Sequence, residues 1–414
     1  MKSVKYILFS IVIIAAVGAG FLFFRSGKTM NFDLSGNATT TPSEVEHPKV
    51  DPNADIENQK PLPNPPSEIK ALYLTAYSAG SSPKVDSIIE LIKSTGTNAV
   101  VIDIKDYTGY ISYDINIPEV IKYGAKEVKI PKVNSLIKKF HDNGIYVIAR
   151  ITMFQDPRLA KARPELAIQS KSKGTTWTDN KKLAWIDPAS REAWDYEVGI
   201  AKDAASRGFD ELNFDYVRFA SDGNLSDMKF NFWDGKSPKH ETIRNFFKYM
   251  RENLSGVKIS VDLFGLATVN KDDLGIGQII EDAYAYFDYV CPMVYPSHYA
   301  PGFLGYKNPA LYPYEIMKYS LDAAMKRLDD YNKDAEPKTI QPATPTGTPT
   351  IIPALHEKSQ AKLRPWIQDF DLGAKYDKTM IDKELKATYD SGISAGWLVW
   401  NPSNNYLKGN LPAN

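Results

Sequence analysis

Two patterns of apolar residues alternate along residues 70–401. Short runs rich in Val, Ile, Leu and aromatic residues predict strands, and apolar positions three or four residues apart predict helices between them. The predicted strands are 70–77, 98–106, 145–154, 209–219, 258–266, 289–295, 363–370 and 395–401. The predicted helices are 83–94, 133–143, 190–207, 242–254, 276–287, 312–331 and 379–391. The chain is therefore expected to be an α/β protein with eight strands.

The number of strands favours a closed barrel. Eight parallel strands joined by helical crossovers close into a (β/α)8 TIM barrel, which we expect over residues 69–407. The alternative is an open doubly wound sheet, which usually has fewer strands and carries a glycine-rich phosphate-binding turn after its first strand. Residues 77–80 read Tyr-Ser-Ala-Gly and do not form such a turn.

The fourth predicted strand, FDELNFDYVRF at 209–219, has polar residues on the face that a barrel would turn inward. Leu212 and Phe214 alternate with Asn213 and Asp215, and the flanking helices would cover the apolar face. Asp215 lies near the carboxyl end of the strand, where barrel enzymes place their working groups, and Arg218 follows it. A structural ion pair that caps the strand is the alternative interpretation.

The segments outside the barrel have a different composition. Residues 1–30 predict a membrane anchor or signal segment, because Lys2 and Lys5 precede an uncharged run, 6–24, that is long enough to span a bilayer. We expect an uncleaved anchor with the barrel outside the cytoplasm, or a secreted protein if the segment is cleaved. Residues 31–68 predict a disordered linker, and the Pro- and Thr-rich segment 333–353 predicts a flexible insertion away from the site.

Charge and composition exclude several classes of function. Lysine plus arginine and aspartate plus glutamate number 50 each, so no basic field is present to attract nucleic acid. Cys291 is the only cysteine and cannot form an internal disulfide, and the five histidines lack the close spacing of zinc sites. We expect a monomer with no metal, no cofactor and no nucleic-acid partner.

Polar residues gather at the carboxyl ends of the predicted strands, which converge on one pocket in a barrel. They are Asp103, Lys105, Asp106, Arg150, Asn213, Asp215, Arg218, Asp262, Tyr295, His298, Gln368 and Trp400. In glycoside hydrolysis, carboxyl groups act as acid, base or nucleophile, and aromatic rings stack on sugars. This set therefore predicts a site for a polysaccharide or oligosaccharide.

Asp215 and Asp262 are the main catalytic candidates, because strand alternation points both side chains inward. Two carboxylates in one pocket of low dielectric raise the pKa of one of them, which separates a proton donor from an ionised partner. Asp103 is the third candidate. Asp262 could instead have a purely structural role. Asp103 and Lys105 could instead belong to an ion-pair network at the barrel mouth.

The other residues are candidates for binding substrate, each with an alternative role. Arg150 could keep Asp215 ionised or could neutralise Asp103. His298 could act on the substrate or could be a solvated loop residue. Gln368 could bind a sugar hydroxyl or could be a satisfied core amide, and Trp400 could be a sugar platform or core packing.

The strand-end motifs resemble a known family. They read, in order, ALYLTAYSAG, NAVVIDIKDYTGYISYD, IYVIARITMFQDP, FDELNFDYVRFASDG, VDLFG, VCPMVYPSHY, RPWIQDF and GWLVWNP. Over about residues 70–404 this series resembles DUF4015, a family of glycoside hydrolase-like domains. The resemblance implies a TIM barrel and an extracytoplasmic setting. The acidic motif residues that correspond in this sequence are Asp103, Asp106, Asp215 and Asp262.

Two functions follow as hypotheses. The first is an anchored glycosidase that acts on cell-envelope or extracellular polysaccharide through Asp215 with Asp262 or Asp103. The second is a non-catalytic carbohydrate-binding barrel of the cell surface, which stays open because no strand-end glutamate is evident. A metal-dependent deacetylase would need more histidine ligands than the sequence offers.

Overall fold

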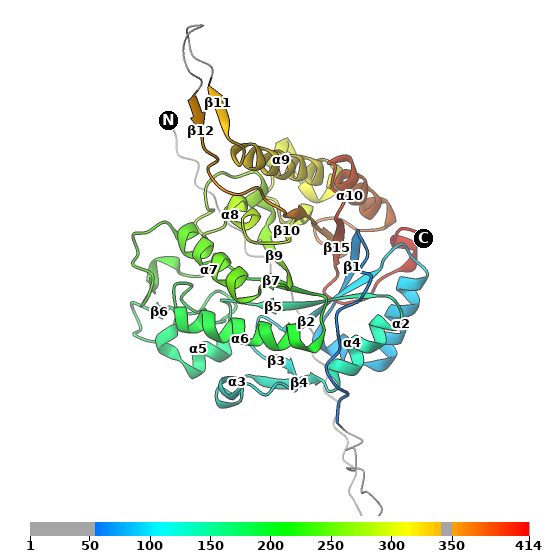
Figure 1. Cartoon of the computed structure of the whole chain (residues 1–414), viewed down its shortest axis with the longest axis horizontal. Coiled ribbons are helices and arrows are strands. Elements are labelled where there is room, and N and C mark those ends of the chain that lie inside the picture. The colour runs from blue at the N-terminus through cyan, green and yellow to red at the C-terminus, as the bar shows by residue number, and fades with distance from the viewer. Residues whose placement is uncertain (1–53, 341–349, 414) are drawn as a thin grey trace, which may run out of the picture. The chain divides into compact units, whose positions relative to one another are not determined.

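The computed structural model describes residues 54–340 and 350–413. Its main sheet closes into a barrel of eight parallel strands, one of which is interrupted (Figure 1). Around the ring the strands are β1 (Ile69–Leu74), β2 (Ala99–Lys105), β5 (Tyr146–Thr152), β7 (Glu211–Asp215), β9 (Lys258–Phe264), β10 (Tyr289–Met293), the interrupted strand formed by β13 (Lys362–Leu363) and β14 (Trp366–Gln368), and β15 (Gly396–Trp400). Strand β1 pairs with both β2 and β15, which closes the ring. The predicted TIM barrel is confirmed, and the open sheet is excluded.

Helices surround the barrel (Figure 1). The longer ones are α2 (Ser82–Lys93), α4 (Val133–His141), α6 (Arg191–Arg207), α7 (Lys239–Asn253), α9 (Pro313–Asp334) and α10 (Lys378–Asp390); α1 (Ala76–Ala79), α3 (Pro118–Lys122), α5 (Pro157–Ala162) and α8 (Ile280–Tyr284) are short. Helix α6 begins one residue later than the predicted 190–207, because Ser190 is its N-cap and accepts a hydrogen bond from the amide of Ala193. It ends where predicted, before Gly208, which has a φ of +98°.

Strand alternation separates two apolar cores. Side chains such as Tyr73, Val101 and Ile148 fill the barrel interior. Side chains of opposite parity, including Leu212 and Phe214, pack between the strands and the helices. The predicted outward direction of the apolar residues of β7 is therefore confirmed, and Asn213 and Asp215 are left on the interior face.

Smaller strands lie outside the ring. Strand β3 (Ile111–Tyr113) pairs antiparallel with β2, and β4 (Lys126–Ile130) pairs with β3; neither strand is among those that the sequence predicts. Strand β6 (Gln169–Ser170) pairs with β8 (Met228–Lys229). The described flanks of the Pro- and Thr-rich insertion pair as β11 (Lys338–Ile340) and β12 (Thr350–Ile352), and residues 341–349 of that insertion lie outside the described residues.

Residues 55–68 are bound to the barrel, although they were predicted as part of a disordered linker. The Asp55 carboxylate accepts hydrogen bonds from the backbone amides of Asn134 (2.6 Å) and Ser135 (3.0 Å) at the start of α4. The amide of Leu62 donates to the Asp210 carboxylate at 2.5 Å. Polar contacts to fixed backbone therefore order a segment that has little apolar surface to bury.

The predicted membrane anchor, residues 1–30, lies outside the described residues. Within residues 54–340 and 350–413, no helix combines the length and the apolar character needed to cross a membrane.

Candidate active site

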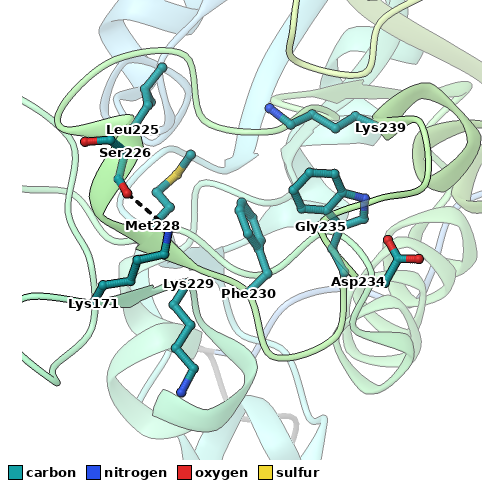
Figure 2. A pocket seen from close by; sticks show the side chains of 10 residues that line it. Lys171, Leu225, Ser226, Met228, Lys229, Phe230, Asp234, Gly235 and Lys239 are labelled. Atoms are coloured by element: carbon teal, nitrogen blue, oxygen red, sulfur yellow. Dashed lines mark hydrogen bonds between the residues drawn. The ribbon is translucent and has the colours of Figure 1, made fainter.

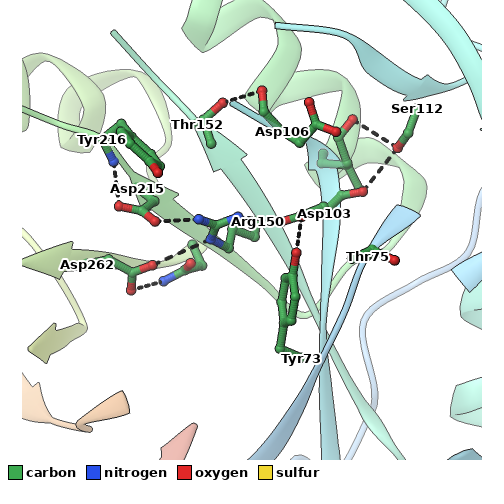
Figure 3. Close-up of polar contacts among 12 residues, drawn as sticks. Tyr73, Thr75, Asp103, Asp106, Ser112, Arg150, Thr152, Asp215, Tyr216 and Asp262 are labelled. Carbon is green, nitrogen blue, oxygen red and sulfur yellow. Dashed lines mark hydrogen bonds and ion pairs between the residues drawn. The ribbon is translucent and has the colours of Figure 1, made fainter. Parts of the chain in front are cut away.

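Arg150 lies at the centre of an acidic cluster at the carboxyl ends of β2, β5, β7 and β9 (Figure 3). Its Nη1 donates to Oδ1 of Asp103 and its Nη2 donates to Oδ2 of Asp215, both at 2.5 Å. Its Nε lies 3.8 Å from Oδ2 of Asp262. One guanidinium group thus contacts all three predicted catalytic carboxyl groups.

Asp262 occupies the most enclosed position of the three and is 1% exposed. Its Oδ1 accepts hydrogen bonds from Trp366 Nε1 at 2.7 Å and from Asn213 Nδ2 at 2.9 Å. Its Oδ2 has no hydrogen-bond partner among the described residues. Burial, and then the negative charge of Asp215, raise the pKa of Asp262 to about 8. Asp262 therefore carries a proton at neutral pH.

Asp215 is held by the backbone of the next residue as well as by Arg150. Its Oδ1 accepts a hydrogen bond of 2.6 Å from the amide of Tyr216. Tyr216 has a φ of +55°, in the left-handed region that a bulky side chain rarely adopts. This turn ends β7 at Asp215, so the strand is shorter than the predicted 209–219. Backbone strain of this kind is common at functional sites.

Aromatic side chains form the wall beside Asp103. The Tyr73 hydroxyl donates to Oδ2 of Asp103. The ring of Trp400 stacks on that of Tyr73 with centroids 4.0 Å apart, and the Arg150 guanidinium lies 5.1 Å from the Trp400 ring. Trp400 is partly exposed, whereas Trp397 is fully buried in the core between strands and helices. Burial raises the pKa of Asp103 above its ordinary value.

Lys105 does not lie at the mouth with the other candidates and forms no ion pair with Asp103, so the prediction that places it there is wrong. The β2–β5 register shifts between Asp103 and Lys105, and this irregularity breaks the alternation of side chains. The Lys105 ammonium group is fully buried, 2.8 Å from the Asp156 carboxylate and 2.9 Å from the Glu197 carboxylate of α6. Lys105 therefore joins the barrel to its helical layer.

Asp106 and Gln368 are engaged by neighbouring protein groups. Asp106 accepts a hydrogen bond from the amide of Thr108 at 2.9 Å and lies 3.5 Å from the Lys129 ammonium group. Gln368 is fully buried; its Oε1 accepts a 2.8 Å hydrogen bond from the Ser297 hydroxyl and its Nε2 donates to the Phe370 carbonyl. For Gln368, the satisfied core amide is the interpretation that fits.

Two further predicted residues lie on the loop after β10, and a third lies below the acids. Tyr295 is buried, and its pKa is raised by burial and by the charges of Asp262 and Asp215. His298 is exposed and packs beside Tyr295, with ring centroids 5.3 Å apart. Asn213 is fully buried and joins Asp262 to the Ser260 hydroxyl, to which it donates at 3.1 Å.

Several residues that were not predicted from the sequence support the cluster from inside the barrel. Tyr73 and Trp366 bind Asp103 and Asp262, and Arg364 forms a fully buried ion pair with Glu211 beneath them. Strand parity could have identified Tyr73, because Leu72 and Leu74 on either side of it pack outward. Trp366 and Arg364 lie where β13 and β14 are interrupted, so parity could not be followed there.

A groove of about 430 Å³ lies apart from the acids, on the loops that carry β6 and β8 (Figure 2). Its lining includes Lys171, Lys229, Lys239, Phe230 and Trp233, and none of the three candidate catalytic residues. The side chains of Asp103, Asp215 and Asp262 are 6%, 8% and 1% exposed, so the acidic cluster is nearly closed to solvent. Among the described residues no group of three His, Cys, Asp or Glu has a geometry that could hold a metal ion.

A solved structure of another protein shares this fold. The glycoside hydrolase domain of PgaB (BpsB) from Bordetella bronchiseptica is similar, with a TM-score of 0.55, 13% identity, and coverage of 84% of this chain and 99% of that chain. A hypothetical protein from Ruminiclostridium thermocellum ATCC 27405 is 44% identical, with a TM-score of 0.43 and coverage of 46% of this chain and 96% of that chain. No curated protein matches the chain.

The match to a family model covers most of the barrel. Residues 71–406 match the DUF4015 model, a range that begins in β1 and ends beyond β15. It includes Arg150 and all three carboxyl groups around it. The chain therefore belongs to the DUF4015 family, which is described as a "putative glycosyl hydrolase domain".

Proposed function

We propose that this protein is a membrane-anchored glycoside hydrolase that cleaves cell-envelope or extracellular polysaccharide by carboxyl acid–base chemistry. One observation carries the proposal: Asp215 and Asp262 lie on neighbouring strands around one arginine, and burial raises the pKa of Asp262 to about 8. Glycosidases need two carboxyl groups, one that donates a proton and one that acts as base or nucleophile.

Each carboxyl group receives a distinct role. Asp215, in its ion pair with Arg150, is the base or nucleophile. Asp262 keeps its proton at neutral pH and is the proton donor. Asp103 is the second candidate for donor, because burial raises its pKa too and its side chain is 6% exposed against 1% for Asp262. The partly exposed ring of Trp400 offers a stacking surface for the sugar.

A carbohydrate-binding barrel without catalysis is the second candidate function. The ion pairs of Arg150 with Asp103 and Asp215 favour it, because they occupy carboxylate oxygens that a hydrolase would turn toward substrate. In that case the polysaccharide binds at the same mouth and is released unchanged.

Asp215→Asn separates the two functions. The amide has the shape of the carboxyl group but cannot act as base or nucleophile, so the variant should keep its fold and lose all release of reducing sugar from a susceptible polysaccharide. Asp114→Asn, which changes an exposed carboxylate on another face, is the matched control and should retain activity. Unchanged turnover by Asp215→Asn would disprove its role, and a wild-type protein that binds glycans without cleaving any would support the binding barrel.

The cellular location needs its own experiment. The uncharged run 6–24 supports an anchor, and the family resemblance supports a barrel outside the cytoplasm. Intact cells treated with a protease that cannot enter should lose the barrel, while the cytoplasmic proteins survive. A barrel that is protected until the cells are broken would contradict this location.

A further inference from the structure

Arg218 is a buried cation without a carboxylate partner within ion-pair distance among the described residues. The residue is 7% exposed, and burial lowers its pKa. Its Nη1 donates to the Phe219 carbonyl at 3.0 Å and to the Ser221 hydroxyl at 3.1 Å, and both acceptors are neutral. The other two buried arginines in residues 54–340 and 350–413, Arg150 and Arg364, each pair with carboxylates. Buried charges in proteins are normally paired, so Arg218 lacks an expected partner.

Arg218 lies at the same end of the barrel as the acidic cluster. Its guanidinium carbon is 4.7 Å from the ring centroids of Trp185 and Phe264 and 5.3 Å from that of Tyr216. Tyr216 directly follows Asp215, and Phe264 is the last residue of β9; both are partly exposed. The aromatic faces stabilise the cation and hold it between two strand ends, but they do not neutralise its charge.

The nearest acidic residues outside the cluster are engaged by other donors. Asp179 accepts hydrogen bonds from Gln155 Nε2 at 2.9 Å and Trp185 Nε1 at 3.0 Å. Asp222 accepts one from the backbone amide of Asn180 at 3.1 Å. The charges of Asp215, Asp222 and Asp179 act on Arg218 only at a distance, and the Asp215 carboxylate is held by Arg150 and by the amide of Tyr216. An ion-pair partner for Arg218 would therefore have to come from a ligand.

The groove of Figure 2 is lined mostly by residues 225–239, which follow Arg218 in the chain, and it is also rich in cations. The ring of Phe219 packs against Phe230 and Trp233 of that groove, with centroids 5.6 Å and 5.3 Å away. The Lys239 ammonium group lies 5.1 Å from the Phe219 ring. Three lysines line the groove against a single aspartate, so its surface attracts anions.

We propose that Arg218 binds the carboxylate of an acidic sugar beside the catalytic cluster, so that the polysaccharide substrate belongs to the uronic-acid class. The guanidinium fork matches a carboxylate in shape and charge. This inference rests on the proposed function, since it places the acidic sugar at the mouth where that function places the substrate.

The test measures binding by the full-length protein in detergent micelles to four acidic polymers: polygalacturonate, alginate, hyaluronan and heparosan. Each is compared with its own carboxyl-reduced form, which keeps the backbone and removes the charge. We expect at least one acidic polymer to bind about tenfold or more tightly than its reduced form. Arg218→Gln should abolish that preference, and Arg218→Lys should keep part of it. Arg244→Gln, which removes an exposed arginine of α7, is the control and should bind like the wild type.

Several outcomes would overturn the inference. They are a preference for the reduced polymers, the absence of binding to every acidic polymer, or an unchanged preference in an Arg218→Gln protein whose melting temperature shows that it is folded. The proposed function fails separately. Acidic polymers that bind through Arg218 but are never cleaved would contradict hydrolysis and support the inference, whereas cleavage of neutral polymers unaffected by Arg218→Gln would do the reverse.

Discussion

Replacing Asp262 with asparagine should make the stability of the protein respond differently to pH. Asparagine has the shape of a protonated aspartate, and its Oδ1 can accept the same hydrogen bonds from Trp366 and Asn213. The other oxygen of Asp262 lies 3.8 Å from Nε of Arg150 and has no hydrogen-bond partner among the described residues, so an amide nitrogen there breaks no hydrogen bond. At low pH, where Asp262 is protonated in both the folded and the unfolded chain, the substitution should be nearly neutral.

The size of the effect follows from one proton. The pKa of Asp262 rises from 3.8 to about 8 on folding, so between these values the folded chain holds a proton that the unfolded chain has released. Stability from this group is complete below the unfolded pKa and is lost as pH rises to the folded pKa, at about 1.4 kcal/mol per pH unit. The asparagine variant lacks this loss. The free energy of unfolding of the variant, relative to that of the wild type, should therefore increase by about 3 kcal/mol between about pH 5 and about pH 7.

Reversible urea unfolding followed by tryptophan fluorescence, at several pH values, measures this difference. Asp288→Asn is the control, because the pKa of Asp288 lies below its ordinary value; burial opposes this shift, and Lys258, Arg251 and the amide of Ile259 produce it. Asp288 contributes stability above its unfolded pKa and loses it only as pH falls below about 4, so the difference between that variant and the wild type should be constant above about pH 4. A constant difference between Asp262→Asn and the wild type over the same range would refute the raised pKa of Asp262.

Three further predictions concern activity and stability. If Asp262 donates the proton, sugar release should fall as pH rises through about 8, and a pH–rate profile with no loss up to about pH 9 would exclude it as donor. Lys105→Met leaves the carboxyl groups of Asp156 and Glu197 buried without a cation, so the free energy of unfolding, measured by heat or urea, should fall by about 3–5 kcal/mol. A fall of less than about 1 kcal/mol would mean that these ion pairs do not stabilise the fold. Gly396→Ala should lower the free energy of unfolding by about 3 kcal/mol or more. The φ of Gly396 is +94°, and an added Cβ would meet the carbonyl oxygen of Ile69 at 1.9 Å, where β1 and β15 close the barrel. A soluble variant with the melting temperature of the wild type would contradict this.

The barrel was predictable because its signal is repeated. Strand parity correctly assigned Leu212 and Phe214 to the outer core, and the caps Ser190 and Gly208 marked the ends of α6. Contacts between distant segments were not predictable. Residues 55–68 have the composition of a linker, and only the folded barrel provides the α4 amides that bind Asp55. Local composition carries no information about such partners.

The candidate site was predictable in its residue types but not in its orientation. The interior direction of Asp103, Arg150 and Asp262 follows from a period of two. The same rule failed for Lys105, because the register shift after Asp103 breaks that period and leaves no trace in the sequence. Arg150 was predicted to pair with either Asp215 or Asp103. Its contact with three carboxyl groups depends on the closure of the barrel.

Because Arg150 is shared, the floor of the barrel mouth holds more acidic groups than cations. Three carboxyl groups, those of Asp103, Asp215 and Asp262, lie around the single guanidinium group of Arg150. A sugar ring gains positive charge as its glycosidic bond breaks, so this excess would stabilise the transition state more than the bound sugar. The floor repels the carboxylate of an acidic sugar, and Arg218 attracts it. Together they would favour one orientation of such a sugar, with its carboxylate beside Arg218 and its reacting carbon beside the carboxyl groups around Arg150.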